Sequence, residues 1–124
     1  MLKLVLKEKV KAKVGKEKDL YRILKQKYFD KAIKIYSTVY RGFPDFIVLS
    51  LKPPYQDLLS YGFYEVKFVW SLPKDLMKLL SPHQAKAFQD LSLAFPCYLV
   101  IGLADVDNAV WLHFHQYTYT QHQP

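Results

Sequence analysis

The chain has 124 residues, of which 51% are hydrophobic and 16% aromatic, and its formal net charge at pH 7 is +7. This length suits one domain with a hydrophobic core, and the composition excludes an intrinsically disordered chain. No apolar run is long enough for a membrane-spanning helix, so we expect a single domain over residues 1–124 and no membrane partner. The positive charge suits a polyanion such as DNA, although it equally serves solubility.

The only cysteine, Cys97, lies in an apolar run, so no disulfide can form within the chain. This usage is typical of a reducing compartment, and we expect a cytoplasmic protein. We interpret Cys97 as a small buried residue rather than as a nucleophile. The apolar positions between Leu2 and Leu6 are too few, and too interrupted by lysine, for a secretory signal.

The first half of the chain predicts a helix and two strands. Residues 1–16 are rich in lysine and predict either a basic arm or the start of the first helix. An apolar stripe at helical spacing predicts a helix over residues 17–29. Alternating apolar residues predict a strand over 31–40, and a turn at 41–44 leads into a second strand over 45–51.

The second half predicts a helix between apolar strands. The sequence Ser-Pro-His-Gln at 81–84 combines an N-cap serine, a proline in the first turn and a glutamine that completes a capping box. The helix that begins there should end near Pro96, and residues 72–80 predict a loop or a short helix. Three apolar runs predict the remaining strands: 62–70, 97–103 and 109–114.

This order of elements predicts an α/β fold with a mixed central sheet of about five strands flanked by helices. The helical crossover should make the strands at 62–70 and 97–103 parallel. The last two strands should form a hairpin. We expect residues 116–124 to form a polar, loosely held tail.

Two short acidic motifs carry the chemistry. Asp45 follows Pro44 at the head of an apolar run, and Glu65 and Lys67 are two residues apart in a predicted strand, so their side chains share one face. Two carboxylates and a lysine can hold a hard divalent cation and a phosphate together. By itself, Asp45 also fits a turn after Pro44. The apolar neighbours of Glu65 and Lys67 predict a buried strand, where charges are costly without a partner or a function.

Pro44-Asp45 followed by Glu65-Val66-Lys67 resembles the signature of PD-(D/E)xK nucleases. Residues 42–47, 62–67 and 80–84 together resemble the VRR-NUC branch, whose near relatives in fold are the archaeal Holliday-junction resolvases. The similarity covers residues 17–103. It implies a restriction-endonuclease-like core and a DNA endonuclease that uses Mg²⁺, with Mn²⁺ as a substitute. The implied substrate is branched or flapped DNA, unless cutting is nonspecific.

The resemblance also implies roles for individual residues. Asp45 and Glu65, together with the backbone carbonyl of Val66, are the expected metal ligands, since Mg²⁺ prefers hard oxygen donors. Lys67 could orient or deprotonate the attacking water or stabilise the transition state, and we favour electrostatic stabilisation because the adjacent carboxylates oppose a lowered lysine pKa. Gln84 is expected to contact the phosphate or a water, while its capping-box role is an alternative.

The family usually supplies a further acidic residue from the first helix. Glu17 is the best candidate for this metal ligand, with Asp19 and Glu8 behind it. A carboxylate in the first turn of a helix is also what the helix dipole favours.

Basic and aromatic residues near the motifs predict contacts with nucleic acid. Five residues are expected to meet phosphates: Arg41, Lys74, Lys78, His83 and Lys86. Three aromatic residues are candidates for stacking on unpaired bases: Tyr61, Tyr64 and Trp70. The His113-Phe114-His115 sequence could bind zinc, but without further ligands we favour a structural interpretation.

Two other functional classes stay open. The chain could be a nucleic-acid-binding module of the same fold without activity, or an RNA-directed binding or processing factor. As an enzyme of this size, without an added recognition domain, it should cut selectively by DNA structure or nonspecifically. We also expect a homodimer, because pairing would enlarge the surface that binds DNA.

Overall fold

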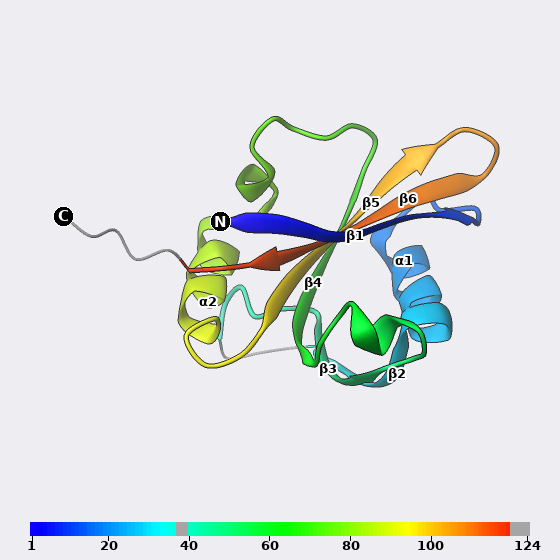
Figure 1. Cartoon of the computed structure of the whole chain (residues 1–124). Helices are drawn as coiled ribbons and strands as arrows, with labels where there is room; N and C mark the ends of the chain where they lie inside the picture. The colour runs from blue at the N-terminus through cyan, green and yellow to red at the C-terminus, as the bar shows by residue number, and fades with distance from the viewer. Residues whose placement is uncertain (37–39, 120–124) are drawn as a thin grey trace.

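The computed structural model describes residues 1–36 and 40–119, which form a curled, mixed six-stranded sheet with a helix on each face (Figure 1). The strands are β1 (Leu2–Lys11), β2 (Phe29–Lys34), β3 (Phe46–Leu51), β4 (Gly62–Val69), β5 (Cys97–Asp105) and β6 (Ala109–Tyr117). The helices are α1 (Glu17–Ile23), which continues as a π-helical turn (Leu24–Tyr28), and α2 (Pro82–Leu91). Short 3₁₀ turns occupy Tyr55–Asp57 and Leu76–Leu79.

The sheet has the strand order β1-β6-β5-β4-β3-β2. The β4–β5 pair is parallel, and α2 lies in the crossover that connects these two strands. The pairs on either side are antiparallel, and β5 and β6 form the predicted hairpin. The parallel crossover and the final hairpin are therefore confirmed.

The prediction for residues 1–16 was wrong, because most of this segment is the edge strand β1. It pairs with β6 from Leu2↔Tyr117 to Lys11↔Ala109, with an irregularity between Leu4 and Leu6. This strand adds a sixth to the five that the sequence predicts. Lysines suit an edge strand because their charge discourages pairing with another chain.

Three predicted boundaries also differ from the structure. The strand predicted over 31–40 begins earlier and is shorter, as β2; residues 37–39 lie outside the described residues. The predicted tail is wrong at its start, because Gln116 and Tyr117 belong to β6 and Tyr117 is buried. The rest of the predicted tail, residues 120–124, lies outside the described part of the chain. The helix predicted to end near Pro96 ends earlier, since α2 stops at Leu91.

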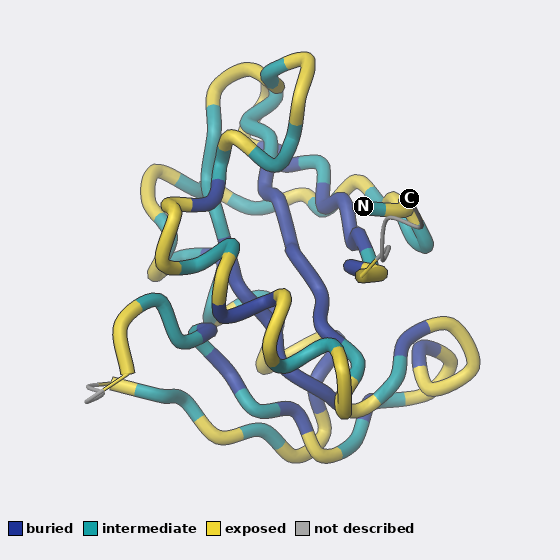
Figure 2. The backbone as a smooth tube through the Cα atoms, turned by 90° about the vertical axis from the view of Figure 1, so that its left-hand side faces the viewer, coloured by how far each residue is buried: buried dark blue, intermediate teal, exposed yellow. Residues whose placement is uncertain are grey.

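Each face of the sheet carries its own hydrophobic cluster. The face covered by α1 buries Leu20 and Leu24 with Val66, and the face covered by α2 buries Phe88 with Leu99. Figure 2 shows the buried residues running along the central strands. A Cβ atom on Gly102 would lie 2.6 Å from the side chain of Leu20, so the glycine allows α1 to pack closely on β5.

The strands β3 and β4 separate at the point where the acidic motifs lie. Their pairing extends over Phe46–Val48 and Gly62–Tyr64, whereas β4 continues beside β5 as far as Val69. Backbone groups of β4 beyond Tyr64 that face β3 are therefore available to side chains rather than to a strand.

Candidate active site

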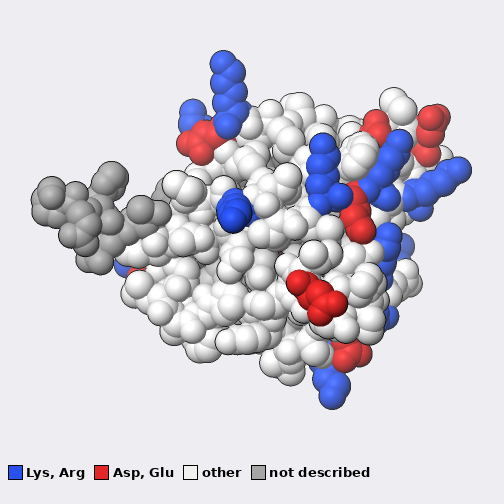
Figure 3. Space-filling view, in the orientation of Figure 1, with Lys and Arg blue, Asp and Glu red and all other residues white. Residues whose placement is uncertain are grey.

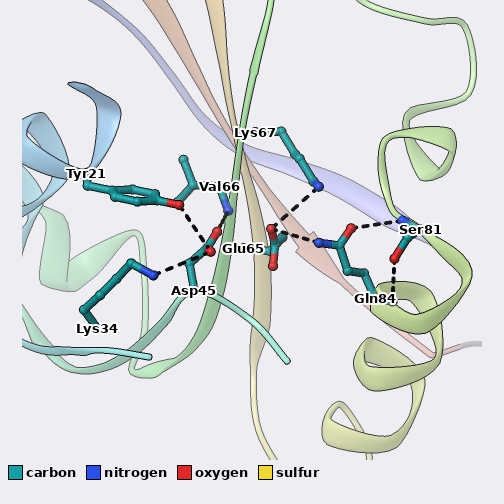
Figure 4. A network of polar contacts seen from close by, with 8 residues as sticks. All are labelled: Tyr21, Lys34, Asp45, Glu65, Val66, Lys67, Ser81 and Gln84. Atoms are coloured by element: carbon teal, nitrogen blue, oxygen red, sulfur yellow. Dashed lines mark hydrogen bonds and ion pairs between the residues drawn. The ribbon is translucent and has the colours of Figure 1, made fainter. Parts of the chain in front are cut away.

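Asp45 lies at the separation of β3 and β4. Its carboxylate accepts a hydrogen bond of 2.8 Å from the backbone N–H of Val66 and one of 3.3 Å from the Tyr21 hydroxyl. The Lys34 ammonium lies 3.8 Å away. Asp45 thus joins α1, β2 and β4, as Figure 4 shows.

The pairing register explains why Asp45 and Glu65 meet. Phe46 is opposite Tyr64 in the last pair of the antiparallel β3–β4 ladder, and Asp45 and Glu65 are the residues one step beyond that pair. Opposite residues in such a pair direct their side chains to the same face, a few ångströms apart. The two acidic motifs thus come together where the strand pairing ends, and the carboxyl groups of Asp45 and Glu65 share a hydrogen bond.

Glu65 is a buried carboxyl group, with 3% of the residue exposed. Burial, then the negative charge of Asp45 and a hydrogen bond with it, raise the pKa of Glu65 to about 9, while Lys67 opposes this rise. The ammonium of Lys67 lies 3.8 Å from the carboxylate oxygen Oε2 of Glu65. In the metal-free protein, a proton on Glu65 is thus favoured at neutral pH.

The side-chain amide of Gln84 contacts two residues, Ser81 and Glu65. Its Oε1 atom accepts a hydrogen bond of 2.9 Å from the backbone N–H of Ser81. The backbone N–H of Gln84 donates to the Ser81 hydroxyl at 3.1 Å, and the two bonds form the predicted capping box. Its Nε2 group donates to Glu65 at 3.4 Å. The capping-box role of Gln84 is therefore confirmed and its side chain also reaches Glu65, whereas its expected contact with a phosphate or a water stays a prediction.

The turn before β3 is fixed against the start of α2. Gly42 has a φ angle of +80°, and a Cβ atom there would lie 2.3 Å from the backbone of His83. Only glycine suits both the backbone conformation and this close approach. The contact sets the distance between the elements that carry Asp45 and Gln84.

Of the three acidic candidates near the first helix, only Glu17 reaches the site. Burial raises the pKa of Glu17, the charge of Lys67 lowers it and that of Asp45 raises it, and the carboxylate accepts a hydrogen bond from the Phe68 N–H. Asp19 instead caps α1, accepting from the N–H groups of Gly15 and Lys16 at 2.9 and 3.2 Å. Glu8 accepts hydrogen bonds from the hydroxyl groups of Tyr28 and Tyr55.

Sequence reasoning missed Tyr21 and Lys34, which both contact Asp45. Tyr21 follows Glu17 by four residues, and this helical spacing places the two on one face, so the signal was present. Lys34 pairs with Phe46 in the β2–β3 register, which the sequence pattern did not reveal. Burial and the charge of Asp45 raise the pKa of Tyr21, so its hydroxyl stays a donor.

The donor set fits a hard cation. Over residues 1–36 and 40–119, no group of three or more His, Cys, Asp or Glu side chains is close enough to hold a metal ion. The protein's share of a Mg²⁺ shell would therefore be the Asp45–Glu65 pair with the Val66 carbonyl, and water and phosphate would complete it. In a strand, a residue's C=O and N–H point to the same side, so the Val66 carbonyl faces the side on which Asp45 accepts its N–H. Glu17 would contribute through water.

Three of the five predicted phosphate-binding residues line one hollow. Arg41 and His83 are 3.4 Å apart and, with Lys86, line a hollow of about 240 Å³ beside the start of α2. Lys86 is paired with Asp90 at 2.8 Å. Lys74 and Lys78 are exposed on the connection between β4 and α2, and neither has a polar contact with the carboxylates within the described residues.

The remaining candidates lie apart from the carboxylates. Tyr64 is fully buried and stacks on Tyr98 at 4.6 Å, so its predicted stacking on a base was wrong, whereas Tyr61 and Trp70 are exposed. Cys97 is buried, which raises the pKa of its thiol to about 12 and agrees with a structural role. The two histidines at 113 and 115 are buried on β6, away from any third ligand in the described chain.

No family model, no curated protein and no solved structure matches this chain. Among the described residues, no helix has both the length and the apolar character needed to cross a membrane. Any functional conclusion therefore depends on the architecture and on the geometry of this site.

Proposed function

We propose that this protein is a Mg²⁺-dependent nuclease, with Mn²⁺ as a substitute, that hydrolyses phosphodiester bonds in DNA from a restriction-endonuclease-like core. The observation that carries the proposal is the Asp45–Glu65 pair, whose carboxyl groups share a hydrogen bond, with the Lys67 ammonium 3.8 Å from Glu65. Two carboxylates and a lysine at a strand separation supply the ligands and the positive charge that phosphodiester hydrolysis needs.

Each residue has a role that its contacts support. A divalent cation held here would lower the pKa of a water bound to it and would neutralise charge on phosphate oxygens. Asp45 is held for this task by the Val66 N–H and the Tyr21 hydroxyl. Lys67 offers an ammonium group beside Glu65, where it stabilises charge that develops on the phosphate. Gln84 orients Glu65 from the start of α2.

One observation favours the alternative of a binding module without activity. Asp45 already has three partners in its surroundings, the Val66 N–H, Tyr21 and Lys34, as a purely structural carboxylate would. In that case the carboxylate ties β4 to α1 and β2, and the basic surface alone binds nucleic acid.

Incubation with branched and linear DNA and with RNA, in Mg²⁺, Mn²⁺ or EDTA, separates these functions. The enzyme cuts DNA only with metal, and Asp45→Ala abolishes the cutting while the protein still folds. Binding without cutting, unchanged in Asp45→Ala, would establish the module. Cutting of RNA but not of DNA would show that the protein is an RNA-processing factor. Light scattering of the same preparations tests the proposed homodimer.

A further inference from the structure

A hollow of about 790 Å³ opens beside the carboxylates, between α1 and the end of β2. Besides Glu17, it is lined by four lysines and two tyrosines: Lys16, Lys18, Lys25, Lys34, Tyr21 and Tyr36. We call it the α1 hollow. Lys and Arg side chains gather more densely toward the right of Figure 3, where α1 lies, than toward the left.

The α1 hollow is continuous with the candidate active site. Tyr21 and Lys34 line the hollow and also contact Asp45, at 3.3 and 3.8 Å. Glu17 lines it as well and accepts the Phe68 N–H from β4. A polymer whose phosphate lies at Asp45 therefore has this hollow as a direct continuation of its path.

The lining combines positive charge with aromatic surface. The Lys34 ammonium lies 5.0 Å from the centre of the Tyr21 ring and 5.2 Å from that of Tyr36. Tyr36 is 86% exposed, the highest fraction among the large hydrophobic side chains of the described residues, so its ring is open to a ligand. Lysines that track phosphates and an exposed ring that stacks on a base are the two elements of single-strand recognition.

We propose that the α1 hollow binds a single-stranded stretch of nucleic acid next to the scissile bond, with its lysines on phosphates and Tyr36 stacked on an unpaired base. The inference extends the proposed nuclease function by assigning it a substrate with an unpaired segment. A duplex fits this lining less well, because its bases are stacked on one another and offer no free face to Tyr36.

The test measures binding in EDTA, so that no cleavage is needed. The variant Lys18→Glu/Lys25→Glu reverses two charges in the hollow, and Lys3→Glu/Lys11→Glu reverses two exposed charges on β1 as the matched control. The probes are a fluorescein-labelled single strand of about 12 nucleotides, as DNA and as RNA, and a blunt duplex. We expect the hollow variant to weaken single-strand binding at least tenfold and to reduce the slope of log Kd against log salt by about 1.5, with a much smaller effect in the control.

A second variant separates stacking from charge. Tyr36→Ala should weaken binding of the single strand about tenfold and leave duplex binding unchanged, whereas Tyr36→Phe keeps the ring and the affinity. Equal weakening by the two lysine variants, or full affinity in Tyr36→Ala, would overturn the proposal. A preference of the wild type for the blunt duplex would do the same.

The binding and cleavage results can fail independently. Loss of binding in the hollow variant without metal-dependent cleavage by the wild type supports the hollow and refutes the nuclease. Cleavage by a hollow variant that binds as the wild type does refutes the hollow and keeps the nuclease. The DNA and RNA strands together show which backbone the hollow accepts.

Discussion

Polar side chains are buried at two places on the same sheet, and the two places differ in the partners that these side chains have. At the β3–β4 separation, Glu65 is buried but has Asp45, Lys67 and Gln84 around it. Two strands away, His113 and His115 are buried, and the ring nitrogens His113 Nε2 and His115 Nδ1 have no hydrogen-bond partner among the described residues. Several ionisable groups therefore surround one another at the β3–β4 separation, whereas the surroundings of the two histidines on β6 favour neutral imidazole rings.

The register shows how closely the two places are related. Leu99 of β5 pairs with Glu65 on one side and with His115 on the other. Ile101 likewise separates Lys67 from His113. One apolar residue of β5 thus separates each of Glu65 and Lys67 from a buried histidine on the same face. Neighbours only two strands apart can therefore have opposite responses to pH.

The two places predict opposite slopes of stability with pH. The raised pKa of Glu65 means that the folded state holds a proton that the unfolded state has lost, so stability falls as pH rises from about 4.5 toward 9. Burial and, for His113, the charge of Lys7 lower the pKa values of His113 and His115 below 6.5. The unfolded state then binds protons first, so stability falls as pH drops below 6.5.

The largest expected effect is that of Glu65→Gln. The neutral amide should lower metal-dependent cleavage at least about 1000-fold, because a buried anionic ligand is lost. In EDTA, the same variant should be more stable by about 1–3 kcal/mol and should lose the decline of stability between pH 5 and 9. Cleavage assays and urea unfolding across pH check both results. A destabilised variant would contradict the assignment of Glu65 as a carboxyl group held at a cost in stability.

The next effect belongs to the histidines. His113→Leu/His115→Leu should remove the loss of stability below pH 6.5, so that the free energy of unfolding changes less between pH 7 and 5 than it does in the wild type. Cleavage at neutral pH should change little, since neither ring belongs to the site. Urea unfolding of both proteins at several pH values is the measurement. Parallel pH profiles for wild type and variant would show that these rings do not titrate on unfolding as expected.

A smaller effect is expected from Tyr21→Phe. The change removes the hydroxyl that donates to Asp45 at 3.3 Å but keeps the ring against Phe46. Cleavage should fall about tenfold, which corresponds to about 1.4 kcal/mol of lost positioning, while stability changes by less than about 1 kcal/mol. Kinetics should show the loss in kcat rather than in KM. Equal kcat values would remove Tyr21 from the site.

The smallest effect separates the two roles of Gln84. Gln84→Ala removes the half of the capping box that its Oε1 atom provides and the contact with Glu65, whereas Ser81→Ala removes the half that the Ser81 hydroxyl provides and keeps the contact with Glu65. Both variants should lose about 1 kcal/mol of stability, and only Gln84→Ala should also lower cleavage, by about threefold to tenfold. Thermal unfolding and cleavage rates of the two proteins check this. Equal cleavage in the pair would leave Gln84 with capping alone.

Local patterns predicted α1, β4, α2 and the final hairpin, because stripes, alternation and the capping box are features of neighbouring residues. They failed for β1, whose lysines resemble a flexible arm until β6 is present to pair with them. The candidate pair Asp45 and Glu65 was also found from its motifs. Lys34 and the α1 hollow were not, because their residues meet only when α1 packs beside β2.

The sequence by itself determined which side chains form the candidate site, since carboxylates after a turn and within an apolar strand are visible in the order of residues. It also determined the start of α2 and the apolar run that forms β4. Only the tertiary structure decided that the carboxyl groups of Asp45 and Glu65 meet, that Glu17 rather than Asp19 or Glu8 joins them, and that the pKa of Glu65 is raised. These properties depend on distance and burial, which arise from strand register and helix packing rather than from spacing along the chain.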